Sequence, residues 1–380
     1  MSALRQKIEQ EIRERGPIPF SRYMEMCLYD ADLGYYCRNA QQFGKAGDFY
    51  TSSDVHAVFG RLLARQFEQM WRTLDSPPRI KIVELGPGRG LFAQDVLDWS
   101  QKTFPDFFRA LHYVLVESSL ALRERMKQTL ARHIESGKAE LAASPAHETD
   151  NNIPVIFFAN EFFDALLVEI VSQQGSLRID ARDGRFVETW VPTSAQELEF
   201  LDRYSVHPEL GERVEVLLAA QQAMERLAAS LLRFGFFITI DYGYTRDEQL
   251  AGRHRGTLKA IRQHSVSASP YEAPGEQDIT ADVNFTALTA AAEKHGMATQ
   301  SLITQSQFLL GIGEANQFAD AFEECRLPQE RAKVALQLKH LITPAGMGEN
   351  FHVLVASKGV EENKVAALAG LNFGRSPTPR

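Results

Sequence analysis

The sequence predicts an α/β protein with a mostly parallel sheet, on three observations. From residue 80 onward, short apolar runs alternate with amphipathic helical patterns, which is the order that β-α-β units produce. The run at 80–85 leads into a turn with three glycines, and the run at 113–116 ends on Glu117. A glycine turn after one strand and an acid after the next describe a nucleoside-binding crevice at the carboxyl ends of parallel strands.

The spacing of the glycines indicates which ligand binds there. A dinucleotide site needs its third glycine at position 91, which is Leu91 in this chain. The observed pattern is instead Glu-x-Gly-x-Gly-x-Gly, formed by Glu84, Gly86, Gly88 and Gly90. An acid that closes the first strand is typical of S-adenosylmethionine (SAM) sites. SAM has no pyrophosphate, so the glycines serve to let the backbone approach the cofactor closely.

Two acids complete the predicted cofactor site. We expect Glu84 to attract the ammonium of SAM, directly or through water, and Glu117 to accept hydrogen bonds from the ribose hydroxyls. The alternative is a strand-to-helix turn whose glycines serve packing alone. The position of Glu117 at the end of a strand favours the cofactor site over that alternative.

Composition narrows the classes of protein and of partner. At 380 residues, 44% hydrophobic and 24% charged, the chain is ordinary for a soluble globular protein with one elaborated domain or two domains. The net charge of -8 and the lack of Lys/Arg runs argue against a nucleic-acid substrate. The histidines and cysteines have no metal-ligand spacing, so no metal is indicated.

The same features predict a cytoplasmic location. The three cysteines form no C-x-x-C pair and suit a reducing compartment. No apolar stretch is long enough to span a membrane. Acidic residues near the start, Glu9, Glu11 and Glu14, argue against a transit or signal peptide.

The pattern along the chain predicts four parts. Helical spacing appears at 4–15 and 55–71, and buried strands at 155–159 and 236–240. Alternation from 168 to 191 around Gln174-Gly175 and Asp183-Gly184 predicts β-hairpins, and 209–233 predicts one or two helices. The parts are an N-terminal helical extension with a cofactor-covering loop (1–78), a core (79–167 and 236–358), an inserted lobe (168–235) and a flexible tail (359–380).

A candidate acceptor site follows the strand at 155–159. Glu161 and Asp164 lie three residues apart and would share one side if a helix starts there. Carboxylates can hold a guanidinium bidentately, and the phenylalanines at 162 and 163 could exclude water. The alternative is that these acids cap a helix. We assign Glu161 and Asp164 to catalysis and Asn160 to the cofactor.

Three other polar segments each allow a functional and a structural interpretation. The loop 47–52 could close over SAM through Gly47, Asp48 and Thr51, or it could be a capping turn. Asp241 follows a strand end, so we expect it to face the crevice as a catalytic residue, although a tight turn would explain it equally. Two further acids, at 278 and 282, flank an expected helix start at Thr280, where capping is the favoured role.

Taken together these segments resemble the MidA-like family of SAM-dependent methyltransferases, which includes a mitochondrial complex I assembly factor that methylates a protein arginine. The matching segments are 16–18, 34–36, 47–52, 83–90, 160–166, 241–243, 255–258, 278–285 and 347–349. The resemblance implies a class I methyltransferase core, a Rossmann-like seven-stranded sheet whose last strand, near 351–357, runs antiparallel. Leu167 departs from the proline usual in the family, which alters the loop after Asp164.

The leading hypothesis is therefore an N-methyltransferase that uses SAM to modify an arginine of a protein partner. The resemblance suggests a respiratory-complex subunit as that partner. The main alternative is a non-catalytic assembly factor that binds SAM and holds its partner through the inserted lobe. A nicotinamide-dependent dehydrogenase is disfavoured by Leu91 and by the large helix that precedes the glycine strand.

Overall fold

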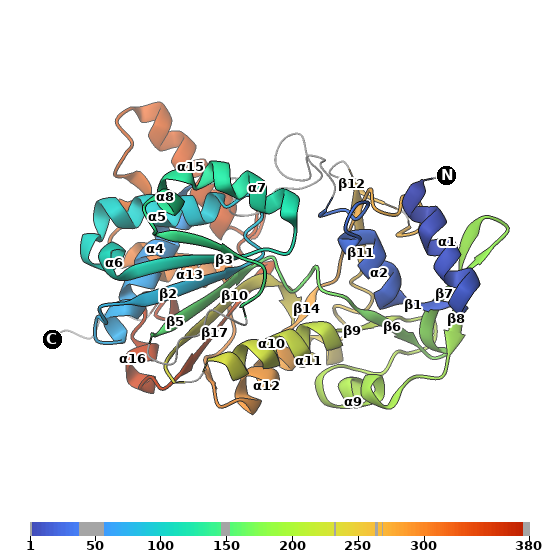
Figure 1. Ribbon diagram of the computed structural model, residues 1–380. Helices are drawn as coiled ribbons and strands as arrows, with labels where there is room; N and C mark the ends of the chain where they lie inside the picture. Colours follow the sequence, from blue (N-terminus) through green and yellow to red (C-terminus); the bar gives the residue numbers. More distant parts are fainter. Residues whose placement is uncertain are drawn as a thin grey trace.

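The computed structural model describes residues 2–37, 57–145, 153–231, 233–262, 265–267 and 269–374. Within these ranges the largest element is a nine-stranded sheet, in the left half of Figure 1, with the strand order β15-β17-β10-β5-β2-β3-β4. Two short strands lie off this path, β14 on β10 and β16 on β17. The strands are β2 (Ile80–Leu85), β3 (Leu111–Val116), β4 (Ala139–Ala142), β5 (Val155–Asn160), β10 (Gly235–Tyr244), β14 (Val283–Asn284), β15 (Ala298–Thr299), β16 (Ile303–Thr304) and β17 (Phe351–Lys358).

The direction of the strands confirms the predicted sheet. The five neighbours β4, β3, β2, β5 and β10 run parallel. The last strand, β17, runs antiparallel to β10. In β2, Ile80 and Ile82 pack in one core cluster, whereas Val83 and Leu85 pack in the other. The strands form continuous apolar runs because both faces of the sheet are covered.

Helices cover both faces of this sheet. The helices α4 (Ala57–Thr73), α5 (Leu91–Thr103) and α13 (Gln305–Glu314) bury their apolar sides in one core cluster. The helices α10 (Leu218–Ser230) and α12 (Phe285–Lys294) pack together in the other. The remaining helices beside the sheet are α6 (Pro105–Ala110), α7 (Leu120–Thr129), α8 (Ala131–Glu135), α14 (Ala319–Phe322), α15 (Pro328–Ile342), α16 (Glu362–Ala366) and the 3-10 helix η2 (Ala369–Leu371).

A second sheet forms the right half of the molecule in Figure 1. It consists of β1 (Ile18–Pro19), β6 (Glu169–Ser172), β7 (Gly175–Arg182), β8 (Arg185–Val191) and β9 (Val214–Val216). The helices α1 (Ala3–Arg15) and α2 (Phe20–Tyr29) pack on β7, and α9 (Ala195–Tyr204) contacts β9. The turn between β7 and β8 places Asp183 and Gly184 at positive φ, as its Asp-Gly sequence predicts.

A small third sheet lies between these two halves. Its strands are β11 (Lys259–Arg262), β12 (Ser265–Val266) and β13 (Asp278–Thr280), with β11 in the middle. The short helix α11 (Arg246–Leu250) follows β10. Because β13 leads directly into β14, this sheet is attached to the end of β10, where the chain leaves the main sheet.

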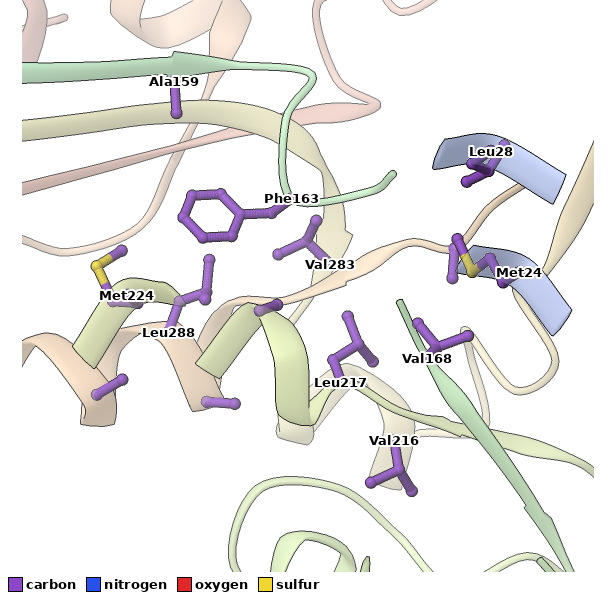
Figure 2. Close-up of a cluster of buried hydrophobic side chains, with 14 of the residues drawn as sticks. Met24, Leu28, Ala159, Phe163, Val168, Val216, Leu217, Met224, Val283 and Leu288 are labelled. Atoms are coloured by element: carbon purple, nitrogen blue, oxygen red, sulfur yellow. The ribbon is translucent and has the colours of Figure 1, made fainter. Parts of the chain in front are cut away.

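Phe163 joins the turn after β5 to the helical layer below it. Its ring is fully buried and is directed toward Leu288 of α12 and Met224 of α10, as Figure 2 shows. In the same picture Met24 and Leu28 of α2 extend this cluster toward the second sheet. One continuous core therefore connects the main sheet to the N-terminal helices.

The structure divides the chain differently from the expected parts. In the range 168–235 only β6 to β9 and α9 belong to the second sheet, because α10 packs on α12 against the main sheet. The segment 209–233 holds a strand as well as a helix. The N-terminal range 1–78 is also split, since α1 and α2 join the second sheet and α4 joins the main one.

Two further differences lie late in the chain. Residues beyond 359 were expected to form a flexible tail, yet through Gly374 they fold as α16 and η2, which contacts α4 and α13. The apolar side chains of Val365 and Leu368 anchor this segment. The second difference is the helix α13, since no helix was expected at residues 305–314. In the part of the chain that the structure describes, no helix is both long and apolar enough to cross a membrane.

The C-terminal segment should contribute measurably to stability. We expect Leu368→Ala to lower the free energy of unfolding by about 2–5 kcal/mol, because the side chain is 1% exposed and its loss leaves a cavity. Leu336→Ala on α15 is the matched control, since that side chain is 68% exposed and should change stability by less than about 0.5 kcal/mol. Urea unfolding followed by circular dichroism measures both. Equal stability of the two variants would mean that residues 360–374 do not pack as described.

Candidate cofactor and acceptor site

A cavity of about 490 Å³ opens where the parallel strands end. Residues at the carboxyl ends of β2, β3 and β5 form one wall, and residues of β11 and β13 form another. Tyr29 and Tyr36, from α2 and the turn after it, also line the cavity. Its volume lies in the range of small-molecule sites, and its position is the crevice that α/β folds use for nucleosides.

The glycine turn lets the backbone form the edge of this cavity. Gly86 has a φ of +64°, and a Cβ there would lie 3.0 Å from the ring of Phe162. Gly90 has a φ of +76°, and a Cβ there would lie 3.1 Å from Met126. Gly86 and Gly88 line the cavity, whereas Gly90 begins α5 behind it. Any side chain at these positions would be strained and would push against its neighbours.

Glu84 is a buried acid at the end of β2. Its carboxylate accepts a hydrogen bond of 2.9 Å from the hydroxyl of Tyr113, and it lines the cavity. Burial raises the pKa of Glu84 to about 8, although the hydrogen bond from Tyr113 partly opposes the shift. A cation placed beside this carboxyl would return it to the charged form.

Glu117 lies where the sequence predicted, at the end of β3. Its Oε1 accepts a hydrogen bond of 2.8 Å from the backbone N–H of Ser119, and the side chain lines the cavity. Burial raises the pKa of Glu117, which hydrogen bonds from the following backbone counteract. The Ser119 hydroxyl donates to the carbonyl of Tyr36, so the N-terminal segment is fastened beside this acid.

Asn160, the last residue of β5, supplies an unused acceptor. Its amide nitrogen donates to Glu161, whereas its buried Oδ1 has no hydrogen-bond partner among the residues that the structure describes. A buried acceptor without a donor is costly unless a ligand completes it. An unpaired acceptor, two buried acids and a glycine edge together fit a ligand that carries an ammonium and a ribose, as SAM does.

The turn after β5 presents Glu161 and Asp164 to the same cavity. No helix starts here, in contrast to the expectation that would have put both acids on one helical face. Glu161 instead adopts a positive φ of 50°. The backbone carbonyl of Asp164 accepts a hydrogen bond from Ala281, which ties the turn to the segment after β13.

Asp241 was expected to face the crevice as a catalytic residue, but it does not line the cavity. It is fully buried at the end of β10, and its Oδ2 accepts hydrogen bonds from the N–H groups of Phe162 (3.1 Å) and Phe163 (2.9 Å). The carboxylate therefore shapes the turn and does not itself line the acceptor space. Burial raises the pKa of Asp241 to about 8, with a further contribution from Glu161. Burial and the neighbouring Asp241 likewise raise the pKa of Asp164.

Sequence reasoning missed two acids of the opposite wall. Asp278 accepts a hydrogen bond of 2.8 Å from the hydroxyl of Tyr36, and Asp282 pairs with Lys259 at 2.9 Å; all four residues line the cavity. Neither caps a helix, since Asn284 caps α12. The alternation of polar positions 278, 280 and 282 with two buried residues is the signal that could have revealed a strand. Gly47, Asp48 and Thr51 lie outside the described residues.

Comparison with known proteins agrees with this geometry. A family model described as an S-adenosyl-L-methionine-dependent methyltransferase matches residues 62–303. The chain belongs to this family. It is 30% identical to the Drosophila melanogaster protein arginine methyltransferase NDUFAF7 homolog, mitochondrial, over 94% of this chain and 85% of that protein. It is 28% identical to the Mus musculus protein arginine methyltransferase NDUFAF7, over 90% and 81%.

Solved structures support the same conclusion. A Burkholderia thailandensis protein bound to S-adenosyl-homocysteine superimposes with a TM-score of 0.83 at 29% identity, over 98% of this chain and 95% of that one. A native structure from the same organism gives a TM-score of 0.80 at 27% identity, over 98% and 94%. The protein is thus a MidA-like, SAM-dependent methyltransferase with a Rossmann-like core, and SAM is its cofactor.

We expect Glu117→Ala to weaken cofactor binding by about 1–3 kcal/mol, because a charged hydrogen-bond acceptor is lost. Titration calorimetry with S-adenosyl-homocysteine measures the change. Glu140→Ala is the matched control, since Glu140 lies on the neighbouring strand β4 but pairs with His112 at the surface. If both variants bind the ligand as tightly as the parent, Glu117 is not the ribose ligand.

Cofactor binding should also release a proton from Glu84. Because the pKa of Glu84 is raised to about 8 in the folded protein, its protonated form stabilises the fold at low pH. This stabilisation is lost as the pH rises through about 8. A ligand ammonium favours the charged carboxylate, so SAM affinity should increase from about pH 7 to above the pKa. Calorimetry in two buffers with different ionisation enthalpies counts the proton. An equal proton count for the parent and Glu84→Gln would contradict the assignment.

Proposed function

We propose that this methyltransferase modifies an arginine side chain of a protein partner. The observation that carries the proposal is the pair Glu161 and Asp164, which a braced turn presents to the cofactor cavity. The names of the NDUFAF7 relatives support it, since each is called a protein arginine methyltransferase. Because the resemblance noted above includes a complex I assembly factor, we extend the proposal to a respiratory-complex subunit as the partner.

The charge of the cavity suits a guanidinium acceptor. Among the residues that the structure describes, six carboxylate residues line it but only two basic ones. The acids are Glu84, Glu117, Glu161, Asp164, Asp278 and Asp282; the basic residues are Arg89 and Lys259. An arginine guanidinium stays charged at any physiological pH and offers five donors in one plane. A buried acidic cavity therefore stabilises it both by charge and by geometry.

The chain itself orients the acceptor and takes up a proton. When bound, SAM supplies a methyl group attached to a positively charged sulfur, and this sulfur is the leaving group when a nitrogen attacks the methyl carbon. Glu161 and Asp164 hold the guanidinium, align one nitrogen and offset its positive charge. The nitrogen loses one proton when it gains the methyl group. Burial and the neighbouring Asp241 raise the pKa of Asp164, so this carboxylate is suited to hold that proton.

Removing either charge should slow methyl transfer. We expect Glu161→Gln and Asp164→Asn to lower the transfer rate by at least about 10²-fold, roughly 2.7 kcal/mol of transition-state stabilisation, with little change in SAM affinity. Asp183→Asn makes the same chemical change in the exposed β7–β8 turn and should have no effect. The readout is mass spectrometry of methyl-arginine, in cells that carry the parent or one of the variants.

The same experiment separates the enzyme from a non-catalytic assembly factor. A catalytic protein gives methyl-arginine that depends on the parent chain and is lost with the two cavity variants. If the partner assembles normally with either variant and no methyl-arginine depends on the chain, the protein binds SAM without turning it over. Near-parental methylation by both variants would instead make these acids structural. The cytoplasmic location stays a prediction from the sequence.

A further inference from the structure

Lys259 brings a positive charge of the chain itself into the acidic cavity. It lies on β11, opposite the glycine turn, and lines the cavity. Its Nζ is 2.9 Å from Asp282 Oδ1 and 5.5 Å from the centre of the Tyr242 ring. Both of these partners also line the cavity. A carboxylate beside an aromatic face is an arrangement that holds cations in proteins.

Asp282, the acid of this cation site, is held by contacts that do not involve the lysine. The backbone N–H of Asp282 donates to Thr257 Oγ1, and both the N–H and the hydroxyl of Thr257 donate to the buried carboxylate of Glu215. The second oxygen of Asp282 contacts His254 Nδ1 at 3.3 Å. The Lys259 side chain, by contrast, is 44% exposed on a flexible stem. Asp282 is therefore anchored, whereas the ammonium can swing into solvent.

We propose that the Lys259 ammonium is a placeholder for the cationic group of the acceptor, which displaces it from Asp282 and Tyr242. This rests on the proposed function only in requiring a cationic acceptor. Two cations cannot share one carboxylate and one ring without repulsion, so acceptor binding must move the lysine aside. The placeholder keeps Asp282 paired with an ammonium until the acceptor arrives.

The exchange also selects the kind of cation. An acceptor lysine would replace one ammonium by another and gain little. A guanidinium can bond two oxygens at once and can stack on an aromatic ring, which a point charge cannot do equally well. Lys259 thus acts as a specificity residue that favours arginine over lysine at the acceptor site.

The test compares binding of two small probes to the full chain saturated with S-adenosyl-homocysteine. The probes are N-acetyl-arginine methylamide and N-acetyl-lysine methylamide, followed by ligand-observed NMR titration. Lys259→Met keeps most of the length of the unbranched side chain and removes the competing charge. Arg262→Met is the matched control, since Arg262 is on the same strand but pairs with Glu276 outside the cavity.

We expect Lys259→Met to bind both probes more tightly, by about twofold to fivefold, in the range that loss of one partly exposed ion pair allows. The gain should be larger for the lysine probe, so the preference for arginine narrows. Arg262→Met should match the parent. Asp282→Asn should bind both probes more weakly than the parent, because the carboxylate over which the two cations compete has lost its charge.

Several outcomes would overturn the placeholder. The first is unchanged or weaker probe binding by Lys259→Met, and the second is no probe binding by either the parent or this variant at millimolar concentration. The third is weaker binding of S-adenosyl-homocysteine by Lys259→Met, which would make the lysine a cofactor ligand. Failure of the proposed function has a different signature. Methyl-arginine would then be absent from cells, although the probe affinities still respond to Lys259→Met.

Discussion

The buried carboxylate of Asp241 holds the turn on which the site depends. A carboxylate in a dry interior needs donors, and the N–H groups of Phe162 and Phe163 supply two of them. The same two bonds force the chain to reverse after β5, with Glu161 in the left-handed region. As a result Phe163 enters the core while Glu161 and Asp164 reach the cavity. One interaction thus links the folding of the main sheet to the chemistry at its edge.

The crowded carboxylates in and around the cavity are electrostatically unfavourable, and a bound cation would stabilise them. Burial raises the pKa of Glu84, Asp164 and Asp241, and nearby carboxylates add to the shift of the last two. Crowded acids in a low dielectric are unfavourable until positive charge arrives. SAM carries such charge on its ammonium and sulfonium groups, and the proposed acceptor carries it on its guanidinium. Lys259 supplies part of it from within the chain.

The opposite wall depends on parts of the chain that lie far from the glycine turn in sequence. Tyr29 donates to the carbonyl of Ala165 at 2.8 Å, and Tyr36 donates to Asp278. From the second sheet, Glu215 accepts from the backbone just before Lys259. The second sheet and the N-terminal helices are therefore structural supports of the acceptor side. Their presence explains why the fold is larger than the sheet that binds the cofactor.

The features that could be predicted from the sequence are those with a local physical cause. The apolar runs, the motif from Glu84 to Gly90 and the acid at 117 depend on strand burial, on positive φ and on the meeting of parallel strand ends, and all of these show in residue order. The predicted parallel sheet and SAM as its cofactor are confirmed on this basis. Glu161 and Asp164 were expected to face the crevice because they come soon after a strand, and both line the cavity.

Which distant residues share the cavity depends on long-range packing and could not be predicted from the sequence. In the sequence, Asp278 and Asp282 resemble helix caps, because the short segment between them has no clear strand pattern of its own. This segment forms β13 only because it pairs with β11. The burial of Asp241 and the position of α10 on α12 depend likewise on neighbours far along the chain. Lys259 reaches Asp282, which lies 23 residues further along the chain, because β11 pairs with β13. Such contacts are long-range packing, which residue spacing does not encode.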